Sequence, residues 1–491
     1  MIPVLLIVIP LLSGLATFLI KQEKAAKTWS LFASLITLVI SVIGIAVVKD
    51  KAALSANLEW LPMLGSSFAV TLDGMGQILC LLTAVAFPMI FGATWNATYK
   101  NAKNFHALML LSQAGLMGVF LAYDALLFYF FWELALIPAY FLCSQWGGER
   151  RIAVTIKFFI YTFVGSLFML IGIIYVYFHT PGQSFALEDF YKAAAALSAK
   201  EQNWLFWTFF VAFAVKMPIF PLHTWQPDTY EQSPTATTMV LSGVMVKMGL
   251  LGVIRWLAPV LPMATWQNGD TVGLLCVIGM IYASIIAMQQ DDLKRLIAYS
   301  SIAHVGLMCL AIFVTSEKGM QGVMIQMFNH GINVIGLWIV VELIERQFKT
   351  RKISELGGLA QKSPALAILL VVVALANVAL PLTNAFIGEF LLFTGVFTST
   401  ASKMGPVFTA VAALSIILSA VYTLNMIQRV FYGNTNQLTA NAREIRTNEK
   451  LVLGILVVAI LVIGVYPKPF LELSQGTVDA IMSKMINKHP I

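Results

Sequence analysis

Three lysines, Lys157, Lys216 and Lys247, lie within long apolar segments of this 491-residue chain. Two glutamates, Glu133 and Glu389, lie in similarly apolar surroundings. A charged side chain at the centre of a bilayer costs roughly 2.5–3.5 kcal/mol on insertion scales, so such residues usually serve transport or proton relay. The types and positions of these residues therefore predict a protein that handles ions or protons inside a membrane.

Lysine and glutamate side chains can exchange a proton when the distance between them changes. At an effective dielectric constant near 20, unit charges about 4 Å apart interact by about 4 kcal/mol, and doubling that distance removes about half of the energy. We therefore expect that a small movement relative to Glu133 could turn a protonated Lys216 into a proton donor. Histidine suits the intermediate positions of such a relay because its unperturbed pKa is near neutrality. His304 and His330 lie on consecutive apolar segments.

Each of these residues also has a plainer interpretation. Lys157 lies close to a polar connection and could extend its ammonium group to the membrane surface. His304 or His330, taken alone, could be a hydrogen-bonded packing residue. Glu133 and Lys216 could form a structural ion pair, although replacing buried pairs with hydrophobic residues is often neutral or stabilising.

Prolines interrupt two of the apolar segments at mid-depth. In the sequence VAFAVKMPIFPLHTW, Pro218 and Pro221 have no N–H to donate and should free carbonyl groups such as that of Ala214. In ANVALPLTNAFIGEF, Pro381 should free the carbonyl of Asn377. Backbone freed in this way persists in hydrocarbon only where it is buried in protein or lines a wet cavity.

Two further polar residues are secondary candidates. Asp124 lies near the end of an apolar segment. His223 follows the first pair of prolines and could satisfy the carbonyl groups exposed there.

The bulk composition places the apolar segments in a bilayer. The chain is 59% hydrophobic and only 11% charged, whereas a soluble globule carries about 25% charged residues. A spanning helix needs about 20 mostly apolar residues. The sequence predicts an all-α polytopic membrane protein with about fourteen transmembrane helices. The segments are residues 2–20, 29–48, 74–96, 106–122, 123–143, 152–179, 204–229, 233–258, 271–289, 293–314, 318–345, 363–395, 405–431 and 450–467.

The proline interruptions fall in the seventh and twelfth predicted spans, which are therefore expected to be discontinuous helices. Paired interruptions at corresponding places predict two inverted five-helix repeats, spans 4–8 and 9–13, with the transport path at the breaks. Two incidental proline kinks are the alternative. The predicted organisation is helices 1–3 in residues 1–105, the first repeat in 106–258, the second repeat in 271–431, and helix 14 with a tail in 450–491.

The basic residues are unevenly distributed among the connections. The net charge is +7 and the isoelectric point about 9.1, but most of the Lys and Arg residues occupy alternate connections, beginning with residues 21–28. This pattern favours a lipid bilayer as the partner and excludes nucleic acid. The positive-inside rule places these connections in the cytoplasm and both termini on the outer, periplasmic side.

The four cysteines, Cys80, Cys143, Cys276 and Cys309, are scattered through apolar segments without CxxC spacing. Their expected role is small apolar packing. No metal site and no redox cofactor is therefore expected in this chain.

Six ordered motifs resemble the antiporter-like membrane subunits of respiratory complex I. The resemblance runs from about residue 70 to 430, and the M (chain 4) type is the most similar because Glu389 stands where the L and N types usually carry lysine. The motifs are FYFFWELALIPAYFL around Glu133, KFFIYT at 157–162, FAVKMPIFPLHTWQPD at 213–228, VKMG at 246–249, DLKRLIAYSSIAHVG at 292–306 and FIGEF at 386–390.

The resemblance implies a proton-translocating subunit of an NADH:quinone oxidoreductase in a bacterial inner membrane, rather than a mitochondrial one. It implies L-type and N-type antiporter-like neighbours, with FMN, iron–sulfur clusters, NADH and quinone bound in partner subunits. It also implies a proton path through six side chains: Glu133, Lys216, Lys247, His304, His330 and Glu389.

The sequence departs from the family pattern at three places. The second break, ALPLTNAF, has no glycine before Gly388. In QPDTYEQSPT, after the first break, Gln226 and Tyr230 replace the Leu and His often found in the family. Beyond His330, Ile332 and Asn333 stand where small residues and serine are common.

Two other functions remain open from the sequence. A multi-chain cation/proton antiporter or a membrane-bound hydrogenase would use the same fold. A passive structural spacer within such a complex would contain the same motifs without moving protons.

Overall fold

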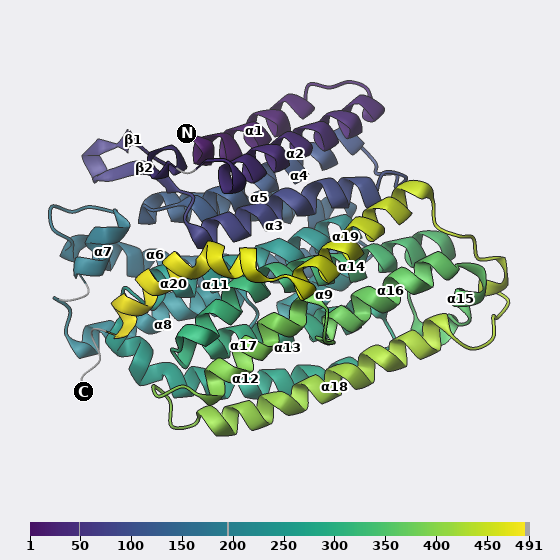
Figure 1. Ribbon diagram of the computed structural model, residues 1–491. Helices are drawn as coiled ribbons and strands as arrows, with labels where there is room; N and C mark the ends of the chain where they lie inside the picture. The colour runs from purple at the N-terminus through teal and green to yellow at the C-terminus, as the bar shows by residue number, and fades with distance from the viewer. Residues whose placement is uncertain (49, 194–195, 487–491) are drawn as a thin grey trace.

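Long helices that run side by side dominate the computed structural model, which describes residues 1–48, 50–193 and 196–486 (Figure 1). Within that part of the chain, eleven helices are long and apolar enough to cross a membrane. Helices suit this role because all of their backbone hydrogen bonds are made within the segment. The prediction of a mostly helical membrane protein is confirmed.

The elements of the first half are α1 (Ile2–Thr17), α2 (Glu23–Ala46), η1 (Lys51–Leu54), β1 (Ser55–Leu61), η2 (Pro62–Leu64), β2 (Ser66–Thr71), α3 (Gly74–Ala93), α4 (Ala102–Leu121), α5 (Ala125–Trp146), α6 (Arg151–His179), α7 (Leu187–Ala193), α8 (Ala199–Lys216) and α9 (Trp225–Gln232). Next come α10 (Thr235–Val240), η3 (Leu241–Met245), α11 (Lys247–Leu251), η4 (Gly252–Leu257), α12 (Pro262–Met288), α13 (Leu293–Phe313), α14 (Glu317–Phe348), η5 (Ile353–Glu355) and α15 (Leu359–Lys362). The last are α16 (Pro364–Asn377), α17 (Asn384–Phe397), α18 (Gly405–Phe431), η6 (Thr439–Asn441), α19 (Thr447–Val465) and α20 (Lys468–Ile486).

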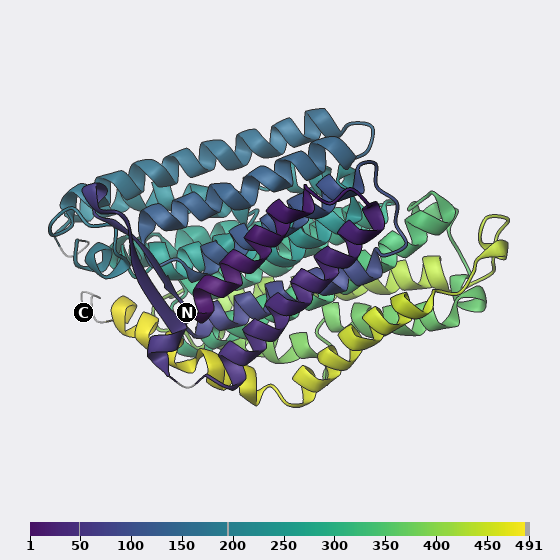
Figure 2. The same cartoon turned by 90° about the horizontal axis from the view of Figure 1, so that it is seen from above.

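The centre of the bundle is formed by the helices that bear Lys247, His304 and His330. The segment from α10 to η4 is 100% buried, α14 is 94% buried and α13 is 89% buried over their most apolar windows. By contrast, α6 and α18 are 39% and 33% buried and lie near the outside of the bundle. Seen from above, the blue helices of the first half lie along one edge and the yellow α19 along the other (Figure 2).

The first proline-rich break separates α8 from α9, as predicted. The expectation that the carbonyl of Ala214 is freed is wrong, because the N–H of Ile219 donates to it over 2.8 Å. Two carbonyl groups near the break are satisfied by side chains instead. The indole N–H of Trp225 donates to Val215 over 2.9 Å, and Lys157 donates to Thr224 over 2.8 Å.

The second break separates α16 from α17, also as predicted. Ala379 and Leu382, on either side of Pro381, adopt positive φ values of 55° and 74°, a region that non-glycine residues rarely occupy. The Asn384 side chain bonds the N–H of Ala385 over 2.8 Å at the start of α17.

The predicted span at residues 233–258 is not a regular α-helix. The segments η3 and η4 are π-helical and flank the short helix α11, which begins at Lys247. A π-helical turn is closed by a hydrogen bond between residues five apart. Here the Val246 N–H donates to the carbonyl of Leu241 over 3.2 Å. Such insertions are frequent at functional sites.

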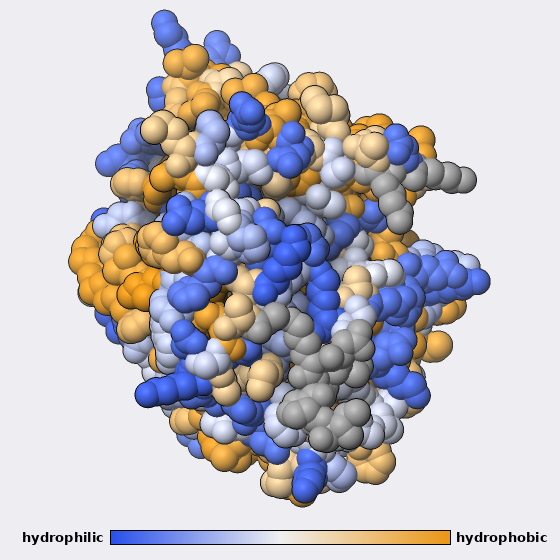
Figure 3. Space-filling view, turned by 90° about the vertical axis from the view of Figure 1, so that its left-hand side faces the viewer, coloured by the Kyte–Doolittle hydropathy of each residue, from blue (hydrophilic) through white to orange (hydrophobic). Residues whose placement is uncertain are grey.

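A two-stranded antiparallel hairpin, β1–β2, projects from one end of the bundle and corrects the all-α prediction. The turn contains Gly65 at φ 67°, and Ser55 pairs with Thr71 at the open end. The hairpin lies near the start of α1 and at the same end as α7 (Figure 1). Polar residues are spread over that end of the molecule, whereas hydrophobic residues gather on its flanks (Figure 3).

Asp124 links the hairpin to the helix bundle. Its buried carboxylate accepts hydrogen bonds from the Ser66 hydroxyl (2.9 Å), the Ser67 N–H (3.0 Å) and the Leu127 N–H (3.0 Å). Burial raises the pKa of this carboxyl, and the two backbone N–H groups oppose that shift. Asp124 is therefore the N-cap of α5 and a support for the hairpin.

We expect Asp124→Ala to destabilise the protein by about 1–3 kcal/mol because it removes a helix cap and leaves buried donors unpaired. Thermal unfolding of the purified native complex measures this change. Asp50→Ala is the control, since Asp50 caps η1 through the Ala52 N–H on an exposed surface. Equal stability of the Asp124 variant and the wild type would contradict the assignment.

Candidate functional site

Lys247 and His330 are in direct contact at the centre of the bundle. The Lys247 ammonium lies 2.8 Å from Nδ1 of His330 and donates to the carbonyl of Ser242 over 3.2 Å. Lys247 is fully buried and comes from α11, whereas His330 comes from α14. A buried ammonium group needs such partners because the surrounding core is apolar.

The contacts continue from His330 to Glu389. The rings of His330 and His304 lie 5.9 Å apart, and Nδ1 of His304 lies 3.0 Å from Oε1 of Glu389. The Ser301 hydroxyl lies 3.2 Å from the second nitrogen of His330. Lys247, His330, His304 and Glu389 therefore form one line across α11, α14, α13 and α17, which we call the central line.

Polar side chains from neighbouring helices surround the far end of the central line. Asn377 lies 3.5 Å from Nε2 of His304 and donates to the Ser300 hydroxyl over 3.3 Å. Tyr422 of α18 donates to the same hydroxyl over 2.8 Å. Gln326 reaches Oε1 of Glu389 over 3.5 Å. These groups fix the orientations of His304 and Glu389.

Lys216 lies apart from the central line, at the end of α8 where the first break begins. Its buried ammonium is 5.6 Å from the ring centre of Trp132 in α5, and no hydrogen-bond acceptor for it is found in the described part of the chain. Half-buried Glu133 follows Trp132 in α5. Within the described residues, no ion pair or hydrogen bond joins Glu133 to Lys216, so the structure brings them to adjacent helices without direct contact.

Gly249 allows α11 to approach α8 closely. A Cβ atom at this position would lie 2.7 Å from the Phe213 carbonyl and 2.8 Å from Cβ of Met217. The helix that carries Lys247 is thus packed directly against the helix that ends at Lys216.

Lys157 and His223 lie beside the first break. Lys157 does not simply extend to the membrane surface, and His223 does not bond the carbonyl groups of the break in the described part of the chain. Lys157 forms a 2.8 Å ion pair with Asp228 of α9, so it is held at the break rather than extended to the membrane surface. His223 stacks on Phe220 with ring centres 5.6 Å apart. Its side chain makes no hydrogen bond to a carbonyl of the break among the described residues, where Trp225 and Lys157 fill that role.

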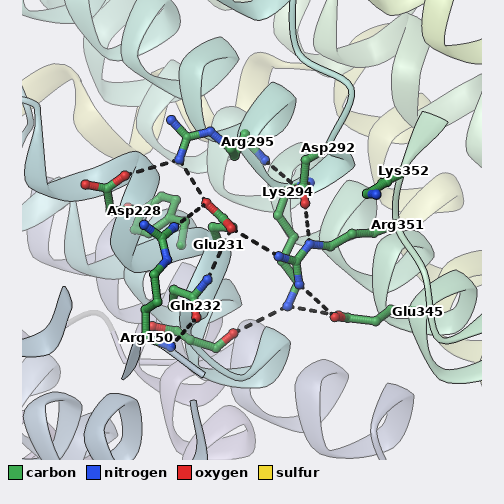
Figure 4. A network of polar contacts seen from close by, with 12 residues as sticks. Arg150, Asp228, Glu231, Gln232, Asp292, Lys294, Arg295, Glu345, Arg351 and Lys352 are labelled. Carbon is green, nitrogen blue, oxygen red and sulfur yellow. Dashed lines mark hydrogen bonds and ion pairs between the residues drawn. The ribbon is translucent and has the colours of Figure 1, made fainter. Parts of the chain in front are cut away.

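A network of ion pairs ties helix ends together at the end of the bundle that carries most basic connections, which we call the basic end (Figure 4). Arg351 binds Asp292, Glu345 (3.0 Å) and Glu231 (3.4 Å). Arg295 binds Glu231 (2.8 Å), and Lys294 binds Glu345 (2.9 Å). Burial acts to lower the pKa of Arg351, but Asp292 and Glu345 outweigh it and hold that pKa above its ordinary value.

The network borders a cavity of about 880 Å³ that we call the basic-end cavity. It is lined by the connections after α3, α5 and α9 and by the last turns of α14, including Glu342 and Glu345. The cavity places ionisable groups near the buried segment that leads to Lys247.

Arg255 is a buried charge that the sequence did not reveal. It lies in η4, binds Asp73 over 2.8 Å and donates to the Phe120 carbonyl over 2.8 Å. Its guanidinium lies 4.7 Å from the ring centre of Tyr123, whose hydroxyl also binds Asp73 over 2.8 Å. Because both terminal nitrogens of the guanidinium have partners near the hairpin end, this cluster stabilises the end of η4.

Comparison with known proteins identifies the family to which this chain belongs. Residues 122–419 match the sequence profile described as the NADH:quinone oxidoreductase/Mrp antiporter transmembrane family. NADH-quinone oxidoreductase subunit M of Rickettsia typhi is 34% identical, over 97% of this chain and 98% of the relative. The chain belongs to this family. The expected resemblance to complex I antiporter-like subunits is therefore confirmed.

Two further relatives show how widely the family is used. The F(420)H(2) dehydrogenase subunit M of Methanosarcina mazei is 33% identical, over 98% of this chain and 99% of the relative. A chain of respiratory complex I from Thermus thermophilus with bound NADH matches with a TM-score of 0.90 and 27% identity, covering 99% of this chain and 100% of that chain.

Several residues of the site were not singled out from the sequence. Ser301 and Gln326 are ordinary polar residues in helices, and only their convergence on the central line distinguishes them. Asn377 stood out for its carbonyl group, but its side-chain contact with His304 was not predicted. Asn384 and Trp225 stand beside the proline breaks, a position that could have marked them as partners of the freed backbone.

Gly249→Ala tests the close packing of the two lysine-bearing helices. The added methyl group would overlap the Phe213 carbonyl, so we expect destabilisation of about 1–3 kcal/mol in thermal unfolding of the complex. Gly454→Ala in α19 is the matched control because a Cβ atom there meets nothing within 4 Å. Equal effects of the two substitutions would show that the approach of α8 and α11 is not constrained.

Proposed function

We propose that this chain is a proton-translocating membrane subunit of a respiratory NADH:quinone oxidoreductase, in the position of the M type. The observation that carries the proposal is the central line of Lys247, His330, His304 and Glu389 within a nearly full-length relative of such subunits. Buried ionisable residues of this kind are costly to place in a membrane, and proton relays are a common reason for retaining them.

The geometry supports a stepwise transfer along the central line. Lys247 can donate a proton to Nδ1 of His330 because the two atoms are 2.8 Å apart. His330 and His304 face each other at 5.9 Å between ring centres, so a rotation or a bridging water completes the next step. His304 then transfers the proton to Glu389 over 3.0 Å.

Lys216 supplies a way to control that transfer. A positive charge that moves away from Glu133 toward α11 raises the cost of keeping Lys247 protonated, since like charges repel more strongly at short distance in a medium of low dielectric constant. The close packing at Gly249 transmits such a displacement between the two helices. Transfer from Lys247 to His330 follows.

The architecture we propose has fourteen crossings and two inverted repeats. The pairs α8 with α9 and α16 with α17 each count as one discontinuous crossing, and α1 and α19 are the first and last. The repeats occupy residues 106–258 and 271–431, with helices 1–3 in 1–105 and the last helix and tail in 450–491. Residues 487–491 of that tail lie outside the described residues.

The basic end is proposed to face the cytoplasm, which places both termini on the periplasmic side of a bacterial inner membrane. L-type and N-type antiporter-like subunits are the proposed neighbours. Electron transfer from NADH to quinone through FMN and iron–sulfur clusters is assigned to partner subunits.

Replacement of Lys247 by Ala, or of Glu389 by Gln, should abolish this subunit's share of proton translocation because each removes one end of the central line. The measurement is the ratio of protons moved to electrons transferred by the assembled complex in membrane vesicles. Lys318→Ala at the start of α14 is a control, because that residue lies in the first turn, at the end of the helix.

Wild-type ratios in both variants, together with impaired assembly, would favour the structural-spacer alternative. Wild-type ratios of protons to electrons in Lys216→Ala and Glu133→Ala would contradict the control of the transfer by Lys216. They would not contradict transfer along the central line.

Purification of the native complex distinguishes the electron-transfer function from an Mrp-type antiporter or a hydrogenase. We expect flavin-containing and iron–sulfur subunits to co-purify with this chain and to oxidise NADH. A complex without them would favour a cation/proton antiporter. Oxidation of an electron donor other than NADH would favour a related dehydrogenase, of the kind named for the F(420)H(2) dehydrogenase subunit M of Methanosarcina mazei.

A further inference from the structure

The carboxylates around the basic-end cavity differ in how they are neutralised. Glu345 is bound by Lys294 (2.9 Å) and Arg351 (3.0 Å), and Glu231 is bound by Arg295 (2.8 Å). Each of these two carboxylates therefore has a basic side chain within ion-pair distance. In the described part of the chain, no ion pair engages Glu342, which lines the same cavity one helical turn deeper in α14.

Thr235 connects these carboxylates to the buried segment that leads to Lys247. Its hydroxyl lies 3.4 Å from Oε2 of Glu345, and it lines the same cavity as Glu342. Thr235 begins α10 and lines the cavity. A proton that enters the cavity therefore meets a carboxyl group and a hydroxyl group side by side.

Two further hydroxyl groups follow Thr235 on the same face of the helix. Thr238 and Ser242 stand three and seven residues farther on, which is the spacing of side chains that share one helical face. Thr238 donates to the Pro234 carbonyl over 3.2 Å, and Ser242 donates to the Thr238 carbonyl over 2.8 Å. At a rise of 1.5 Å per residue, the three hydroxyl groups cover about 10 Å of depth.

The π-helical segment η3 brings Lys247 into line with this face. Lys247 is five residues beyond Ser242, and in a regular α-helix a residue at that spacing would point away from the hydroxyl groups. The i→i+5 hydrogen bonds of η3 make five residues close to one turn. The Lys247 ammonium accordingly donates to the Ser242 carbonyl over 3.2 Å.

We propose that Glu342, Thr235, Thr238 and Ser242 form the route by which protons reach Lys247 from the basic-end cavity, with Glu342 as the group that first takes up the proton. The inference rests on the proposed function and names the uptake side of the same path. Glu345 has a different role: it holds Lys294 and Arg351 at the rim and leaves Glu342 as the carboxyl group free to change its charge.

Proton translocation by the assembled complex in inside-out membrane vesicles tests the route. We expect Glu342→Gln, Thr235→Val and Ser242→Ala each to reproduce the loss caused by Lys247→Ala. Thr235→Ser should restore wild-type translocation because it keeps the hydroxyl group. Thr237→Val is the matched control, since Thr237 is buried on the other side of α10 and its hydroxyl has no hydrogen-bond partner in the described part of the chain.

The amount of assembled complex on native gels separates folding defects from transport defects. Valine has nearly the shape of threonine, so the Thr235→Val and Thr235→Ser pair decides the proposal even if Glu342→Gln lowers assembly. Loss in Lys247→Ala with wild-type translocation in Thr235→Val and Ser242→Ala would overturn the route and leave the proposed function intact. Wild-type translocation in Lys247→Ala would overturn the proposed function itself.

Discussion

The fold is organised by the need to give the buried ionisable groups of the central line polar partners. Hydrocarbon cannot solvate an ammonium or carboxylate group, so the protein must place another side chain or a carbonyl group within reach. Lys247 meets this requirement through His330 and Ser242, and Glu389 does so through His304. In the central line, each ionisable side chain lies next to another one, and the four side chains come from four helices.

Irregular backbone gives the site its geometry. The two breaks end α8 at Lys216 and begin α17 shortly before Glu389, and the π-helical segments flank the helix that begins at Lys247. At the first break the Trp225 indole donates to the Val215 carbonyl, and at η3 the Lys247 ammonium donates to the Ser242 carbonyl. A regular helix would leave these carbonyl groups occupied and the lysines facing other directions.

The sequence identified the buried residues of the central line, but it did not predict the contacts between them. Lys247, His304, His330 and Glu389 were identifiable because a charged or titratable side chain in an apolar segment is unusual. Their order of contact was not predictable, since it depends on how four helices pack together. Arg255 was missed because it lies at the end of an apolar segment and its partner, Asp73, is far away in the chain. The π-helical segments were missed because no residue pattern distinguishes them from an α-helix. The β-hairpin was missed because residues 55–71 form a connection between two predicted spans.

The continuity of the central line is most directly tested at its middle, where His330 joins the half of the site that contains Lys247 to the half that contains Glu389. Replacement of His330 by Leu leaves both ends in place and removes only the link between them. We expect the complex to assemble and to transfer electrons while its ratio of protons moved to electrons transferred falls. An unchanged ratio would show that protons do not pass along this line.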